Sequence, residues 1–171
     1  MQMNLSGNKI IRKGTSIIEI LVVTFVISVA LVTLLGSIAF YLRTSILIEE
    51  TTKANFLAQE AMEAVRNFRD AITWTNDDPA NQYDGLGVVA VDEAYYVSKS
   101  SNVPPKWMLL RGSETIGIFT REIYFENVQR DTNKDIVASG GVNDPNTKKA
   151  TVRVVWKNKE INLVTYFANW R

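Results

Sequence analysis

Glu19 is the residue whose type and position most strongly suggest chemistry. It is the only charged residue between Gly14 and Arg43, and the residues around it are almost all apolar. A carboxylate inside an apolar run is costly when lipid surrounds it. We therefore expect Glu19 either to stay near water at a membrane interface or to pair with a cation.

The rest of the sequence contains few residue patterns that would indicate catalysis or metal binding. The 171 residues include no cysteine and no histidine, which excludes disulfides, Cys/His metal sites and histidine-dependent catalysis. Asp131, Asn133 and Asp135 have the spacing of a calcium loop, but an EF-hand loop would need glycine at Ile136 and glutamate at Val142. We interpret this segment as a solvated turn. No catalytic residue, metal or cofactor is expected, and the chain is predicted not to be an enzyme.

The remaining charged and aromatic groups favour structural roles. The acidic pairs 77–78 and 92–93 are interpreted as solvated loops. Three of the 19 basic residues lie in the first 14 positions, and the rest of the chain has a net charge of −2, so a nucleic-acid partner is not expected. A candidate basic edge near the last hairpin consists of Lys148, Lys149, Arg153, Lys157 and Lys159. Trp107, Trp156 and Trp170 are interpreted as core or sheet-face residues rather than as a ligand platform.

The segment that carries Glu19 is long enough to cross a membrane. Residues 15–42 could span a bilayer as one helix. Lys9, Arg12 and Lys13 precede this run, whereas Glu49 and Glu50 follow it. This asymmetry predicts a single-pass membrane protein with its N-terminus in the cytoplasm and its C-terminal domain on the other side of the membrane.

The helical pattern continues beyond the apolar run. Residues 43–75 contain no proline and no glycine. They carry an apolar stripe at helical spacing, formed by Leu57, Ala61, Val65, Phe68 and Ile72. We predict one helix from about Ile17 to Trp74, ended by residues 76–79 with their proline.

Residues 76–171 are predicted to form a globular β domain. Residues 76–106 are interpreted as a loop region with one short strand at 88–91, and residues 127–149 as a polar loop. The last two strands alternate apolar and polar residues, so one face of their sheet must be dry, and the helix stripe would cover it. The expected fold class is α+β, a long N-terminal helix packed on a small antiparallel sheet. Strands are predicted at 107–111 and 116–126 around a hairpin-like break at 112–114, and at 150–157 and 160–168 around a turn at 158–159.

Three interpretations of the N-terminal segment remain open. A signal peptide could be cut after Ala39, before Phe40, but the apolar run is longer than the roughly 7–15 residues that such peptides use. A plain membrane anchor fits the length and leaves Glu19 unexplained. The third interpretation gives Glu19 a function of its own.

The stretch KGTSIIEI, which begins at Lys13, resembles the processing site of type IV prepilins and type II secretion pseudopilins. In that family a short basic leader ends in glycine, and a membrane aspartyl protease cuts after this glycine on the cytoplasmic side. The new N-terminal amine is methylated, and the fifth residue of the mature chain is glutamate. Here the cut would fall between Gly14 and Thr15, and the fifth residue from Thr15 is Glu19.

This resemblance implies a structural subunit of a type IV pilus or a pseudopilus. It makes residues 1–14 a cleaved leader, 15–42 a transmembrane and filament-core helix, 43–75 its amphipathic half, and 76–171 a pilin β domain. Thr15 would be methylated, and Glu19 would pair with the Thr15 amine of a neighbour. The implied partners are the prepilin peptidase, the inner-membrane assembly platform and other pilins or pseudopilins.

Two departures refine the resemblance. The family usually has phenylalanine after the cut, where this chain has Thr15. Major pilins commonly carry a proline within the apolar helix, whereas no proline precedes Pro79 here. The chain is thus most similar to minor pilins of the PilV kind and to I-type minor pseudopilins. The alternative function is a signal-anchored extracytoplasmic binding domain that does not polymerise.

Overall fold

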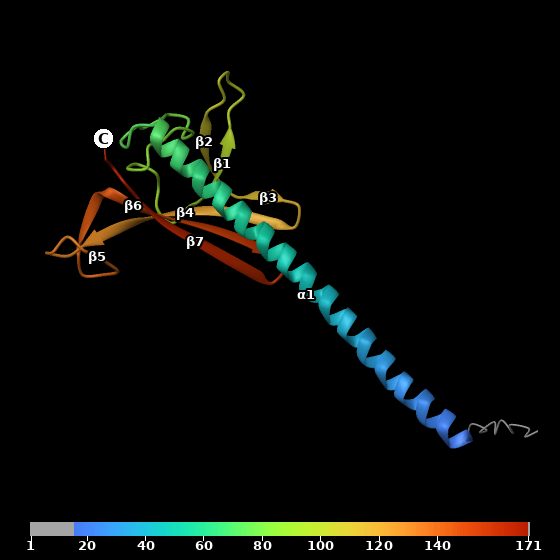
Figure 1. Ribbon diagram of the computed structural model, residues 1–171. Helices are drawn as coiled ribbons and strands as arrows, with labels where there is room; N and C mark the ends of the chain where they lie inside the picture. Colours follow the sequence, from blue (N-terminus) through green and yellow to red (C-terminus); the bar gives the residue numbers. More distant parts are fainter. Residues whose placement is uncertain (1–15, 171) are drawn as a thin grey trace, which may run out of the picture. The chain divides into compact units, whose positions relative to one another are not determined.

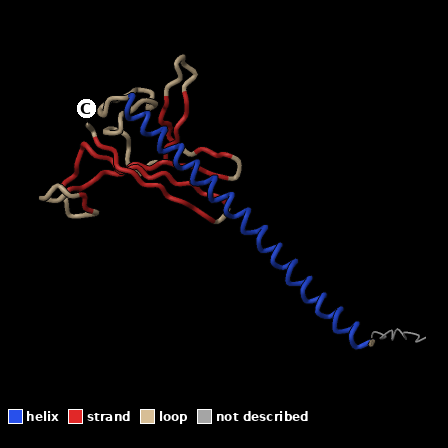
Figure 2. The backbone as a smooth tube through the Cα atoms, in the orientation of Figure 1, coloured by secondary structure: helices blue, strands red, loops and turns tan. Residues whose placement is uncertain are grey.

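The computed structural model describes residues 16–170. They form one long helix and a sheet in which every strand pair is antiparallel, so the predicted α+β class is confirmed (Figures 1 and 2). In chain order the elements are α1 (Ile17–Ala71), β1 (Ala94–Lys99), β2 (Trp107–Arg111), β3 (Glu114–Ile116), β4 (Phe119–Arg130), β5 (Ile136–Val137), β6 (Val142–Trp156) and β7 (Lys159–Ala168).

Helix α1 passes through two compact units of the chain. One unit ends at Ile48, and the other begins at Glu49 and contains the rest of α1 and all the strands. The helix ends at Ala71, three residues earlier than predicted. The reason is Trp74, which is buried outside the helix and donates from Nε1 to the carbonyl of Pro145 at 2.9 Å.

The amphipathic stripe of α1 is confirmed, and it is wider than predicted. Ala61, Val65 and Phe68 are buried against the sheet, and Leu57 and Ile72 pack at the margin of the same core. Alanine adds little thickness to a helix, so the alanine-rich face lets the helix lie close to the strands. The additional buried residues of this face are Ala54, Ala58, Met62 and Ala64.

The sheet is organised around β4. The strand order is β2-β1-β4-β6-β7, and β3 and β5 also pair with β4. Since β6 pairs along nearly the whole of β4, the strands β3, β1 and β5 must follow one another along its other edge. Residues of α1 and of the inner sheet face belong to one buried cluster, which includes Phe68, Ile123, Phe125, Val152 and Val154.

The last hairpin confirms its predicted faces, but its turn lies one residue earlier. Val152 lies opposite Leu163, and Val154 lies opposite Ile161. Trp156 pairs with Lys159, so Lys157 and Asn158 form the turn. Lys157 has φ 49°, in the left-handed region that tight two-residue hairpins use.

Three predictions for residues 76–126 are wrong. Residues 88–91 form no strand, since the backbone N–H groups of Val88 and Val89 both donate to the carbonyl of Gly85 in a turn. The strand of this region is β1, which pairs with both β2 and β4.

Strand β2 has its predicted bounds, yet it does not form a hairpin with β4. The predicted strand 116–126 is divided at Gly117, whose φ of +62° turns β3 back onto β4.

The polar segment 127–149 is mostly strand rather than loop. It contains the end of β4, all of β5 and the first half of β6. Asn127 pairs with Lys148, and the next residue, Val128, pairs with Asp144. Residues 145–147 therefore form a bulge in the ladder between β4 and β6. Pro145 sits in this bulge, where its missing N–H costs no ladder hydrogen bond.

Candidate functional site: an exposed apolar helix segment with one carboxylate

The first part of α1 presents an apolar surface. All residues from 16 to 43 are exposed, and Ile46, Leu47 and Ile48 extend the apolar surface by a further turn. The helix is long and apolar enough to cross a membrane, judged by its length and composition. A surface of this extent on a water-soluble chain would be a liability, so the segment is built to be covered.

The serine and threonine hydroxyl groups of this segment already have hydrogen-bond partners within the helix. Thr24, Ser28, Thr33 and Ser37 are the hydroxyl-bearing Ser and Thr residues between Ile17 and Leu42. Each donates to a backbone carbonyl three or four residues earlier in the same helix, at 2.7–3.0 Å. A bilayer offers no water to such groups, and these bonds remove the cost of placing them there.

Glu19 is the only charged side chain among residues 16–42. It lies in the first turn of α1, where its backbone N–H donates to the carbonyl of Ser16 at 3.0 Å and the helix dipole favours a negative charge. Its carboxylate is exposed and has no ion-pair or hydrogen-bond partner among residues 16–170. Whatever covers this helix must therefore supply water or a cation at Glu19.

The other residues of the expected processing site lie outside the described part of the chain. They are Gly14 and Thr15, at the predicted cut, and the leader charges Lys9, Arg12 and Lys13.

The candidate calcium loop is a turn built on Asp131. Its Oδ1 accepts the backbone N–H groups of Asn133 and Asp135, both at 2.9 Å. Within residues 16–170 no group of three or more acidic side chains is close enough to hold a metal ion. The Asp131 carboxylate thus has a local structural role.

The two acidic pairs are not merely solvated. Asp78 Oδ2 accepts the backbone N–H groups of Gln82 and Tyr83 at 3.0 and 3.3 Å, and so it organises the loop after α1. Glu93 forms an ion pair with Arg111 of β2 at 3.1 Å. The other member of each pair, Asp77 and Asp92, is exposed as expected.

The candidate basic edge consists largely of paired side chains. Lys148 is buried and donates to Asn127 Oδ1 at 2.7 Å. Three other members form ion pairs: Lys149 with Glu126 at 3.0 Å, Arg153 with Glu160 at 2.9 Å and Lys157 with Glu50 at 2.5 Å. This edge of the domain therefore does not present an array of unpaired cations.

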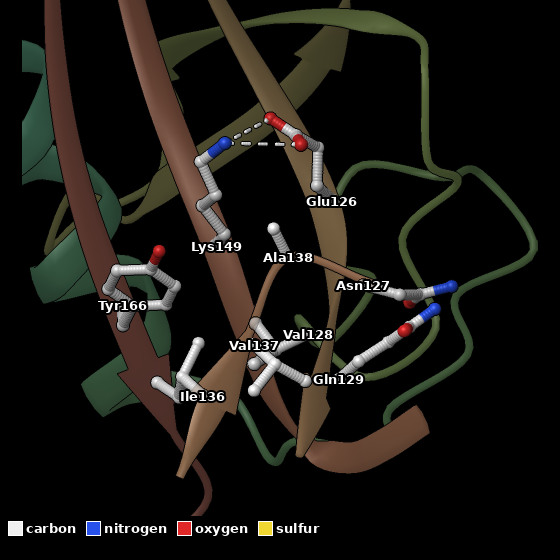
Figure 3. A pocket seen from close by; sticks show the side chains of 9 residues that line it. All are labelled: Glu126, Asn127, Val128, Gln129, Ile136, Val137, Ala138, Lys149 and Tyr166. Carbon is white, nitrogen blue, oxygen red and sulfur yellow. Dashed lines mark hydrogen bonds and ion pairs between the residues drawn. The ribbon is translucent and has the colours of Figure 1, made fainter. Parts of the chain in front are cut away.

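A hollow of about 310 Å³ lies on the outer face of the sheet, beside Tyr166 and β5 (Figure 3). Lys149 and Glu126 meet at one end of it as an ion pair. In Figure 3, Asn127 and Gln129 point to one side of β4, and Tyr166 and Lys149 lie on the other. Because these polar groups do not converge on one point, we do not assign this hollow as a site.

The sequence interpretation missed Arg121 of β4, whose side chain is 5% exposed and contacts α1 and β3. A signal was present, since Arg121 alternates with Phe119 and Ile123 on the apolar face of its strand. Among the three tryptophans, Trp156 is a core residue and Trp107 packs at its margin, as predicted. The prediction is wrong for Trp170, which is 64% exposed.

No protein-family model, no curated protein and no solved structure matches this chain.

Proposed function

We propose that this chain is a structural subunit, of the minor kind, of a type IV pilus or a type II secretion pseudopilus. The observation that carries the proposal is Glu19, the one charged side chain among residues 16–42, in the first turn of its helix. In this proposal the leader is cut after Gly14, Glu19 becomes the fifth residue of the mature chain, and the protein acts without catalysis.

The chemistry of assembly follows from the charge of Glu19. When apolar helices pack side by side, water leaves the space between them, and a carboxylate there needs a cation. The new α-amine at Thr15 of a neighbouring subunit carries a positive charge near neutral pH. An unpaired buried carboxylate would cost several kcal/mol, so this pair would act mainly on the register of one helix against the next.

The apolar segment would serve twice. It would hold the subunit in the inner membrane before assembly and would line the filament core afterwards. Its four internally bonded hydroxyls support both uses, because neither environment has to supply hydrogen-bond partners. The prepilin peptidase, the assembly platform and other pilins would be the partners at successive stages.

The first experiment is the mass of the N-terminal peptide of the mature protein, taken from membranes of its native host. A peptide that begins at Thr15 and is heavier by one methyl group is expected. Thr15 without the methyl group would keep the subunit proposal and remove only the methylation step. A start at Phe40 would indicate an exported soluble protein, and an intact Met1 a plain anchor; either result would contradict the proposal.

The second experiment separates assembly from membrane insertion. Glu19→Ala should leave the protein folded and membrane-bound but should abolish its recovery in sheared filaments. Glu49→Ala, which removes an exposed carboxylate later in the same helix, is the matched control and should assemble normally. Normal incorporation of Glu19→Ala would refute the role of the carboxylate.

A further inference from the structure

A second hollow lies where the end of α1 meets the end of β7. Its volume is about 290 Å³, just below the roughly 300–1,000 Å³ typical of ligand pockets. It is lined by Arg69, Ile72, Thr73, Trp74, Thr75, Ala168, Asn169 and Trp170. Since all of these residues belong to the unit that begins at Glu49, the hollow is a feature of one folded domain.

The indole of Trp170 is held beside this hollow by a stack of side chains. The guanidinium carbon of Arg69 lies 5.7 Å from the ring centroid of Trp170 and 5.7 Å from that of Phe167. This arrangement gives an attractive cation–π contact on each ring. Trp170 nevertheless remains 64% exposed. It is thus a positioned aromatic surface with room for a further group.

Arg69 itself is already engaged. Its Nη1 donates to the carbonyl of Ala168 at 3.3 Å, and its Nε lies 2.9 Å from Asp70 Oδ1 in an ion pair. Arg69 is also the only charged residue of the lining. The charge that a ligand would meet is therefore largely compensated, which disfavours an anion and favours a neutral ligand.

The rim of the hollow is polar but uncharged. Thr73 and Thr75 are exposed and bring two hydroxyl groups. Asn169 is fixed by its backbone N–H, which donates to the carbonyl of Asn146 at 2.8 Å, and by its Nδ2, which donates to Asn146 Oδ1 at 3.1 Å. Trp74 donates its own N–H to Pro145, so its ring contributes an apolar wall.

We propose that this hollow binds one pyranose ring of a saccharide. The C–H face of the ring would stack on the indole of Trp170, and the hydroxyls at its edge would bond to Thr73, Thr75 and Asn169. A neutral ligand with one apolar face and several hydroxyl groups matches both parts of the lining. The inference does not depend on the pilus proposal, since a non-polymerising anchored domain could bind the same ligand.

The test uses the full chain in an amphipol, because many detergents carry sugar headgroups that would compete. The probes are methyl glycosides of glucose, galactose, mannose and N-acetylglucosamine, observed by saturation-transfer NMR and by tryptophan emission. We expect transfer to the ring protons of at least one probe. The three hexosides represent glycans without amino sugars, and the N-acetylglucosamine glycoside, which is also neutral, represents the amino-sugar glycans of cell walls. The preferred probe therefore indicates the class of saccharide.

Three variants make the result specific to the hollow. Trp170→Ala should weaken binding by about tenfold or more through loss of the stacking surface. Thr73→Val removes one hydroxyl at nearly constant shape, so it is expected to weaken binding by several fold without disturbing the fold. Phe56→Ala removes an exposed aromatic side chain of α1 outside the lining and should change nothing.

Two results would overturn the proposal. One is the absence of transfer to all four glycosides at tens of millimolar. The other is equal transfer in Trp170→Ala and in the unmodified chain.

Discussion

Arg121 of β4 donates a hydrogen bond from Nη1 to the main-chain carbonyl of Leu57, in the second half of α1, at 2.9 Å. The same nitrogen lies 3.2 Å from Glu60 Oε2, and Nη2 lies 2.5 Å from Glu114 Oε2 of β3. One buried guanidinium therefore ties the helix, the central strand and the short strand β3 together, and it fixes the register of α1 along the sheet.

Replacing Arg121 should loosen this junction. We expect Arg121→Met to lower the free energy of unfolding of the domain by about 2 kcal/mol, because charge-assisted bonds to three acceptors are lost. Arg121→Lys should recover little, since an ammonium group lacks the planar fork that spans separate acceptors. Urea unfolding followed by tryptophan fluorescence measures both. Arg66→Met is the control: Arg66 pairs with Glu63 on the exposed helix surface and should matter by less than about 0.5 kcal/mol.

Gly87 is predicted to tolerate no side chain. A Cβ at this position would lie 2.5 Å from Trp74 Cδ1 and 2.8 Å from the Trp74 carbonyl oxygen, which accepts the Gly87 N–H. Gly87→Ala should therefore displace Trp74 and destabilise the domain by about 2 kcal/mol, as overpacking does. Thermal unfolding monitored by near-UV circular dichroism would detect it. Gly36→Ala should not be destabilising, because nothing lies within 4 Å of its added Cβ; a destabilised Gly36→Ala with an unaffected Gly87→Ala would contradict this account.

Asp144 should make stability depend on acid pH. Hydrogen bonds from Arg130 and Thr147, each 2.7 Å long, hold the pKa of Asp144 below its usual value of 3.8. A depressed pKa in the folded state means that the stabilisation is present above the unfolded pKa and is lost as pH falls through the folded pKa. Asp144→Asn should thus lower the unfolding temperature at pH 7, and the difference should shrink as the pH falls below 3.8. An unchanged difference at low pH would show that the amide, not the lost charge, causes the effect; Asp135→Asn is the exposed control.

Lys148 should respond in the opposite direction. Its burial lowers the pKa of its ammonium group from the usual 10.5, and the group donates a hydrogen bond to the neutral amide of Asn127. The folded state therefore releases the proton first, and stability should rise as pH increases from the folded pKa toward 10.5. Lys148→Met should stabilise the domain by about 1 kcal/mol near neutral pH, since it removes a buried charge that has only the neutral Asn127 as its partner within residues 16–170. The gain should diminish in alkaline buffer; a destabilised variant at neutral pH would show that the Asn127 bond outweighs the burial of the charge.

The elements that could be predicted are those whose signal is local. The stripe of α1 and the faces of β6 and β7 repeat at the periods of a helix and a strand, so burial on one side followed from the sequence. Strand β1 has six residues and depends on pairing with β2 and with Tyr124 and Ile123 of β4. The first half of β6 is polar and contains Pro145, and its strand conformation depends on pairing with β4 and, from Thr147 on, with β7. The residues that pair with these strands lie in other parts of the chain, so the local sequence pattern does not predict the pairing.

The same distinction applies to the functional residues. Glu19 could be singled out because a charge in an apolar run is visible in the sequence itself. The role of Arg121 depends on acceptors at Leu57, Glu60 and Glu114, which only folding brings together. The hollow beside Trp170 likewise combines two short segments, residues 69–75 and 168–170.

The hydroxyls of α1 have one further consequence. Because Thr24, Ser28, Thr33 and Ser37 all donate to their own helix, the segment carries its acceptors with it. Moving the helix from lipid tails to the side chains of neighbouring helices would break none of these bonds. For these four hydroxyl groups, a membrane and a filament core are therefore energetically similar. Glu19, the one charged side chain among residues 16–42, is the group for which the two surroundings differ most. If the helix moves from a membrane into a filament, its preference for one medium over the other would depend largely on the carboxylate of Glu19, and Glu19→Ala is expected to change that preference.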